Sequence, residues 1–179
     1  MSERKVDIIT DLDGNKIVFI HDTYFKGKKK VNWNDVEEYL KRYIGEVYKI
    51  EDTDDLIYIG TDLPDEYAHS NYTQNLKGAN AKAKGNAVTG IPELIEIATN
   101  KRYMDNIKEK HSANARYGWY KYDSRVGLPI YNDCGEVERY NVFHIVILVR
   151  HDKNGKMYLY DVMNIKKRNE QSFPVIRPY

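Results

Sequence analysis

The chain has 179 residues and a formal net charge of +1, which suits one domain or one domain with a small appendage. Its single cysteine, Cys134, excludes an internal disulfide and any zinc site built from several cysteines. The near-neutral charge argues against bulk binding of duplex DNA but leaves room for a local basic cleft. No apolar run approaches the ~18 residues of a membrane span, and no signal peptide is recognisable, so we expect a cytoplasmic protein with no membrane partner.

Residues 1–46 predict a β-hairpin followed by a helix, which together form a ββα appendage. Apolar segments flank an Asp-Gly turn signal within residues 5–20. A basic tip at residues 26–30 precedes the helix, for which Asn34 is the expected N-cap and Gly45 the expected end. A unit of about 45 residues buries too little surface to be stable alone, so we expect it to dock on the rest of the chain.

Residues 47–168 predict a second unit in which helices come before strands. A short strand over residues 56–59 is followed by a helix-leaning segment over 70–86 and by a helix with Pro92 in its first turn. Another helix is expected over residues 101–112.

The chain is then expected to change to strands from residue 118 and to end in an irregular tail over residues 169–179. The expected strands are 119–122 with a continuation at 128–131, a long central strand over 140–150, and 157–163. This order predicts a segregated α+β fold and not a doubly wound parallel sheet.

Residues 110–125 are the most distinctive stretch, because they combine a histidine, two arginines, two lysines and four aromatic residues. Cations bind phosphate, aromatic faces stack on bases, and a histidine moves protons near neutral pH. The stretch therefore suits a site directed at RNA, although the mouth of a tyrosine-rich sheet without a function has the same composition.

The histidines give fewer firm predictions. From spacing alone, His111 is better explained as a helix-capping residue than as a catalytic one. Arg150 and His151 end the long strand, and only one of them can face a given cleft because strand neighbours point to opposite faces. We interpret His144, in the middle of that strand, as a core histidine.

No local motif supports chemistry that depends on a metal or cofactor. The chain has no histidine pair with metal-ligand spacing, no glycine-rich phosphate loop and no nucleophile elbow, so we expect no metal and no cofactor. RNA cleavage without a metal needs only a base, an acid and a cation, which histidine, tyrosine, lysine and arginine can supply.

Several ordered segments of the chain also carry a resemblance to a known family. They are YIGTDLPDEY at 58–67, ELIEIA at 93–98, KH at 110–111 with GWYKY at 118–122, and LVRH at 148–151 with KMYLYD at 156–161. These segments are similar to a family of large polyvalent protein-associated domains found in phages, plasmids and conjugative elements. The resemblance implies the fold shared by barnase, EndoU, colicin RNases and RelE, in which helices precede a four-stranded antiparallel sheet. It also implies a metal-independent endoribonuclease or a binder derived from one.

The resemblance implies four catalytic candidates, without assigning base and acid: His111, Tyr120, Arg150 and His151. The candidates for RNA binding are Lys82, Lys84, Lys110, Arg116, Lys121 and Arg125. Position 121 is lysine where the family leads us to expect arginine, and position 126 is valine where a larger apolar residue is expected. The lysine weakens any planar grip on phosphate, so a role in binding alone stays open. We expect residues 110–125 to form one wall of a cleft whose opposite wall is the end of the strand over 140–150.

The resemblance further implies a counter-defence protein of a mobile element, acting in the bacterial cytoplasm. The expected partner is RNA or a ribonucleoprotein, for example a CRISPR effector with its guide RNA, which would make the protein an anti-CRISPR. One alternative is an inhibitor without enzymatic activity that binds a host defence protein such as a type II CRISPR effector, using surface tyrosines and the tip at residues 26–30. A second alternative is a structural or assembly domain.

Overall fold

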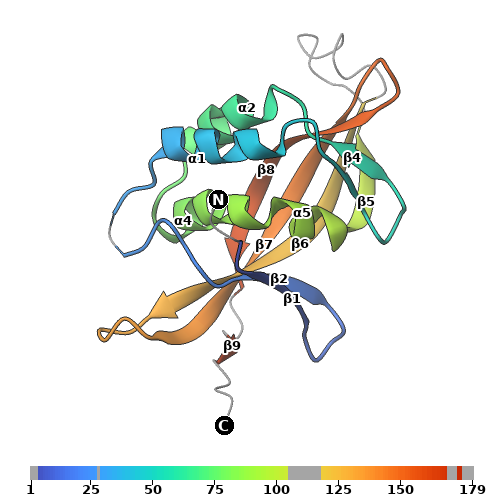
Figure 1. Cartoon of the computed structure of the whole chain (residues 1–179). Helices are drawn as coiled ribbons and strands as arrows, with labels where there is room; N and C mark the ends of the chain where they lie inside the picture. The colour runs from blue at the N-terminus through green and yellow to red at the C-terminus, as the bar shows by residue number, and fades with distance from the viewer. Residues whose placement is uncertain (1–3, 28, 105–117, 169–172, 175–179) are drawn as a thin grey trace.

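The computed structural model describes residues 4–27, 29–104, 118–168 and 173–174, which fold into an α+β protein with helices on one face of a strongly curled sheet (Figure 1). The helices are α1 (Trp33–Leu40), α2 (Leu63–His69), α3 (Asn71–Gln74), α4 (Gly78–Ala87) and α5 (Ile91–Glu96), with 3-10 turns at Lys41–Tyr43 and Val88–Gly90. The strands are β1 (Val6–Thr10), β2 (Lys16–Ile20), β3 (Val47–Lys49), β4 (Leu56–Tyr58), β5 (Thr99–Met104), β6 (Trp119–Tyr131), β7 (Val137–His151), β8 (Met157–Lys167) and β9 (Phe173–Pro174).

One mixed sheet contains all of these strands. Its main path runs β1-β2-β6-β7-β8-β4-β3, while β5 pairs with β6 and β9 with β7. The run β5-β6-β7-β8 is antiparallel, but the expected four-stranded antiparallel sheet is corrected: the sheet is larger and mixed, and β5 lies where the sequence predicted a helix. The hairpins β1-β2 and β3-β4 extend the sheet through parallel pairs, β2 with β6 and β4 with β8. The sequence predicted the β1-β2 hairpin but not these parallel pairs.

The core lies between the helices and one face of the sheet. Side chains alternate between the two faces of a strand. The face that carries the helices contributes these buried residues from the central strands: Tyr122, Val126, Leu128, Phe143, Ile145, Ile147 and Val149. The other face of the central strands is more open, since most of its side chains are only partly buried, and a small apolar cluster of Ile17, Phe19 and Val142 lies at one end.

His144 lies on this open face, so its interpretation as a core histidine was wrong. The expectation assumed that β7 is covered on both faces, whereas the helices cover only one. Partial desolvation and the nearby Arg125 and Arg168 cations lower the pKa of His144.

The N-terminal ββα unit docks on the rest of the chain, as expected. Val18 of β2 pairs with Val126 of β6, and Val36 and Leu40 of α1 join the same core as the central strands. The helix begins earlier than predicted, because the side chain of Asn32, and not of Asn34, accepts hydrogen bonds from the first-turn backbone amides.

The helix predicted over residues 101–112 was wrong in its described part, where Thr99–Met104 forms strand β5. Pairing with β6 and a hydrogen-bonded ion pair between Arg102 and Asp123 (2.9 Å) hold this segment extended. The helix containing Pro92 is confirmed as α5. Within the described residues, no helix is long and apolar enough to span a membrane.

Candidate functional site

Tyr120 and His151 meet at one end of the central strands, on the face that carries the helices. Tyr120 lies near the start of β6 and pairs with Val149 of β7, and His151 lies two residues further along β7. Their ring centroids are 5.8 Å apart, and both residues are partly buried. Two of the side chains predicted to be catalytic therefore share one site.

Strand β5 adds an ammonium group and a second phenol to this site. The Lys101 Nζ lies 4.5 Å from the centroid of the Tyr120 ring, and the Tyr103 ring lies 5.3 Å from the same centroid. Tyr103 is exposed. The sequence analysis missed both residues because it assigned their segment to a helix; a strand assignment would have placed Lys101 and Tyr103 on one face.

Asp55 holds Lys101 in place. The Lys101 Nζ lies 2.8 Å from Asp55 Oδ2, and the Tyr122 hydroxyl donates a 2.7 Å hydrogen bond to the same oxygen. Burial alone would raise the pKa of Asp55, but the hydrogen bonds from Lys101, Thr53 and Tyr122 keep that pKa below its ordinary value. The carboxylate therefore stays ionised near neutral pH and forms an ion pair with the Lys101 ammonium group beside Tyr120.

Arg150 does not join Tyr120 and His151. It pairs with Trp119 and Tyr158 across the ladders, on the opposite face of the sheet from His151, so the prediction that only one of these neighbours faces a given cleft is confirmed. Its guanidinium lies 2.5 Å from Asp62 and 5.1 Å from the centroid of the Tyr158 ring, and its side chain is only 12% exposed. A bound phosphate would have to compete with Asp62 for this group.

Three of the predicted residues lie outside the described part of the chain: His111, Lys110 and Arg116. The described part of the same stretch corrects the expected cleft. Trp119 and Arg125 pair directly with Arg150 and His144, so the two segments are neighbouring strands of one sheet and not opposite walls.

The remaining predicted cations are dispersed. Lys84 is fully buried and donates to Asp161, so it is unavailable to a ligand. Lys121 and Arg125 lie on the open face of the sheet, away from Tyr120. Lys82 lies in a pocket at the other end of β6.

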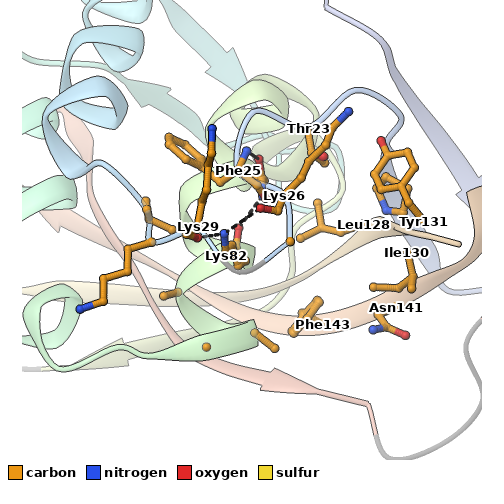
Figure 2. Close-up of a pocket in the computed structure, with 18 of the residues that line it drawn as sticks. Thr23, Phe25, Lys26, Lys29, Lys82, Leu128, Ile130, Tyr131, Asn141 and Phe143 are labelled. Carbon is orange, nitrogen blue, oxygen red and sulfur yellow. Dashed lines mark hydrogen bonds between the residues drawn. The ribbon is translucent and has the colours of Figure 1, made fainter. Parts of the chain in front are cut away.

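That pocket is the second chemically distinctive region, and we call it the lysine pocket (Figure 2). It has a volume of about 1390 Å³ and lies between the loop that precedes α1, the start of α4 and the far ends of β6 and β7. Five lysines line it: Lys26, Lys29, Lys30, Lys77 and Lys82. The sequence analysis named a basic tip at residues 26–30 and Lys82 as a candidate for RNA binding. It did not connect them, because they lie on two segments that are distant in sequence.

Within the described residues, one group has donors close enough to share a metal ion: Glu37 of α1 with Asp65 and His69 of α2. The His69 Nε2 already lies 2.8 Å from Glu37 Oε1, which is an interhelical ion pair when the histidine is protonated. This group is distant in sequence from every predicted site residue.

Comparisons with known proteins add no relative to this picture. No protein-family model, curated protein or solved structure matches the chain.

Proposed function

We propose that this protein acts on RNA and cleaves it without a metal ion at the site formed by Tyr120, His151 and Lys101. The observation that carries the proposal is the convergence of an imidazole, a phenol and an ammonium group from three strands, with ring centroids of Tyr120 and His151 5.8 Å apart and Lys101 4.5 Å from the Tyr120 ring. These are the group types that metal-free phosphodiester cleavage requires.

In the proposed reaction, the ribose 2′-oxygen attacks the adjacent phosphorus and the bond from phosphorus to the 5′-oxygen breaks. A base accepts the 2′-hydroxyl proton and an acid protonates the departing 5′-oxygen, which yields a 2′,3′-cyclic phosphate and a 5′-hydroxyl. His151 and Tyr120 are the two proton-transfer groups, and the Lys101 cation stabilises the charge on the phosphorane. Exposed Tyr103 offers a face on which a base can stack.

The test is incubation of the purified chain with total RNA in EDTA, followed by analysis of RNA length and of end groups. We expect cleavage by the natural chain and a loss of about 100-fold or more for His151→Ala, because general acid–base catalysis contributes roughly that much. Tyr120→Phe keeps the ring and removes the hydroxyl, and it should also reduce the rate. His144→Ala is the matched control, because His144 lies on the same strand but on the opposite face. Equal rates for His151→Ala and His144→Ala would refute the assignment.

The finer fold assignment, a barnase-, EndoU- or RelE-like architecture, belongs to the same proposal. The order of α2, α4 and α5 before the antiparallel run β5-β6-β7-β8 supports it. A counter-defence role for a mobile element stays a prediction, and it names the substrates to add to the test: guide RNA alone and guide RNA within a CRISPR effector.

A binder without catalysis is the second candidate, and the lysine pocket favours it. The pocket offers cations for an anionic partner at the opposite end of β6 from Tyr120. Tight RNA binding by the natural chain with no cleavage under any condition would select this alternative.

A further inference from the structure

Side chains of α4 fix the loop that forms one wall of the lysine pocket. The Lys82 ammonium on α4 donates to the carbonyl oxygens of Lys26 (3.3 Å) and of Lys29, as Figure 2 shows. The Asn86 side chain accepts hydrogen bonds from the backbone amides of Tyr24 (3.0 Å) and Phe25 (3.1 Å). The loop that carries Lys26 and Lys29 is therefore fixed to α4 by side chains.

Within the described residues, no carboxylate forms an ion pair with the cations of the pocket. No acidic residue is among its described lining residues either. Desolvation is the main cause that lowers the pKa of Lys82, and crowding by the nearby Lys29 cation adds to it. An anionic occupant would relieve this crowding.

The walls of the pocket are aromatic and apolar. Phe25 and Trp33 line it on the side of the loop and α1, and Leu128, Ile130 and Tyr131 line it on the side of β6. The Lys26 Nζ lies 4.6 Å from the centroid of the Tyr131 ring. Proteins that bind single-stranded nucleic acid stack the bases on aromatic rings and bind the phosphates with nearby cations, and this pocket offers both kinds of group.

The size of the pocket points to more than one nucleotide. Its volume of about 1390 Å³ exceeds the roughly 300–1000 Å³ of ordinary small-molecule pockets. We infer that the lysine pocket binds a short segment of single-stranded nucleic acid, with phosphates on the lysines and bases on the aromatic walls. This adds a binding site to the proposed function and does not depend on cleavage.

The test uses a labelled oligouridine with 2′-O-methyl groups, which cannot be cleaved by attack of the 2′-oxygen, so binding is measured independently of the proposed chemistry. The variant Lys29→Gln/Lys30→Gln/Lys77→Gln removes three exposed pocket lysines and spares Lys82, which anchors the loop. The control removes the same charge at three exposed positions that do not line the pocket, Lys16→Gln/Lys153→Gln/Lys167→Gln.

We expect the pocket variant to bind at least about tenfold more weakly than the control at moderate salt. Its slope of log affinity against log salt should be smaller by about 2, because each phosphate contact on a single strand contributes about 0.7. Trp33 supplies a direct readout in a Trp119→Phe background, which leaves it as the sole tryptophan. Its fluorescence should be quenched by the oligonucleotide.

Three results would overturn the inference. The first is equal affinity and equal salt slope for the pocket and control variants. The second is unchanged Trp33 fluorescence at saturating oligonucleotide. The third is tighter binding of polyglutamate than of oligouridine, which would identify an acidic protein segment as the occupant. Binding at the pocket without any RNA cleavage would refute the proposed active site alone, and RNA cleavage together with equal oligonucleotide binding by the pocket and control variants would refute the pocket alone.

Discussion

The buried pair formed by Lys84 and Asp161 supplies a quantitative prediction about stability. The Lys84 side chain is 0% exposed and that of Asp161 is 5% exposed, with 2.6 Å between Nζ and Oδ1. Lys84 also donates to the Thr73 hydroxyl at 2.5 Å and lies 4.6 Å from the centroid of the Tyr67 ring. Burial lowers the pKa of Lys84 and raises that of Asp161, while their mutual attraction opposes both shifts.

Removing one partner leaves a buried charge without compensation. Lys84→Met should therefore lower the free energy of unfolding by about 3–5 kcal/mol, a typical value for breaking a buried ion pair. For a chain of 179 residues, where 1 kcal/mol shifts the melting temperature by about 2–4 °C, this corresponds to about 6–20 °C. Asp161→Asn should have a smaller effect, because the amide oxygen can still accept the 2.8 Å hydrogen bond from the Val162 amide.

The assay is urea unfolding of both single variants and of the double variant Lys84→Met/Asp161→Asn. We expect the double variant to be more stable than the sum of the single losses predicts, by at least about 1 kcal/mol, because neighbouring groups are not additive. Lys153→Met, at an exposed lysine, is the control and should change stability by less than about 0.5 kcal/mol. A loss below about 1 kcal/mol for Lys84→Met, or strict additivity, would refute the reasoning.

Two further predictions test packing and titration. A Cβ at Gly127 would lie 2.4 Å from Phe19 Cδ1, so Gly127→Ala should lower the free energy of unfolding by about 1–3 kcal/mol, and Phe19→Leu in the same chain should restore part of it; an unchanged urea midpoint would contradict this. Desolvation, the largest cause, raises the pKa of Tyr48 to about 12 from its ordinary value of 10.0. Since the folded-state pKa is the higher one, the contribution of Tyr48 is fully present below pH 10 and is lost as the pH rises through 12. Tyr48→Phe should make the fall in unfolding free energy over this range shallower, and identical pH profiles would exclude the effect.

Local signals in the sequence correctly predicted those elements for which the turn residues and the spacing of apolar residues indicate the same structure. The Asp-Gly turn, the long strand that became β7 and the helix with Pro92 in its first turn are of this kind. The helix prediction failed at the described residues 101–104, which belong to β5. Their extended conformation depends on pairing with β6, which is distant in sequence and leaves no signal in the local pattern of apolar residues. The parallel pairs of β2 with β6 and of β4 with β8 were missed for the same reason.

The candidate site also combines residues that local signals place correctly with residues whose position depends on contacts between distant segments. The family resemblance named Tyr120 and His151 as candidates, and both lie on strands, β6 and β7, that the sequence marks clearly. Lys101 could not be placed beside them without β5. Lys84 was assigned to RNA binding because a lysine is usually exposed, but Asp161 and Thr73, which are distant in sequence, satisfy its ammonium in the core.

The positions of the two sites on β6 decide how an RNA can use them. Tyr120 and Tyr131 are eleven residues apart on this strand, which at about 3.3 Å per residue is at most about 36 Å. Helix α5 packs on β6 between them, where the Ser124 hydroxyl donates a 2.8 Å hydrogen bond to the Leu94 carbonyl. A bound strand therefore cannot lie straight along this face from one site to the other. A short RNA should then occupy either site alone, so Lys29→Gln/Lys30→Gln/Lys77→Gln should leave its cleavage rate unchanged while slowing cleavage of a long RNA at limiting concentration.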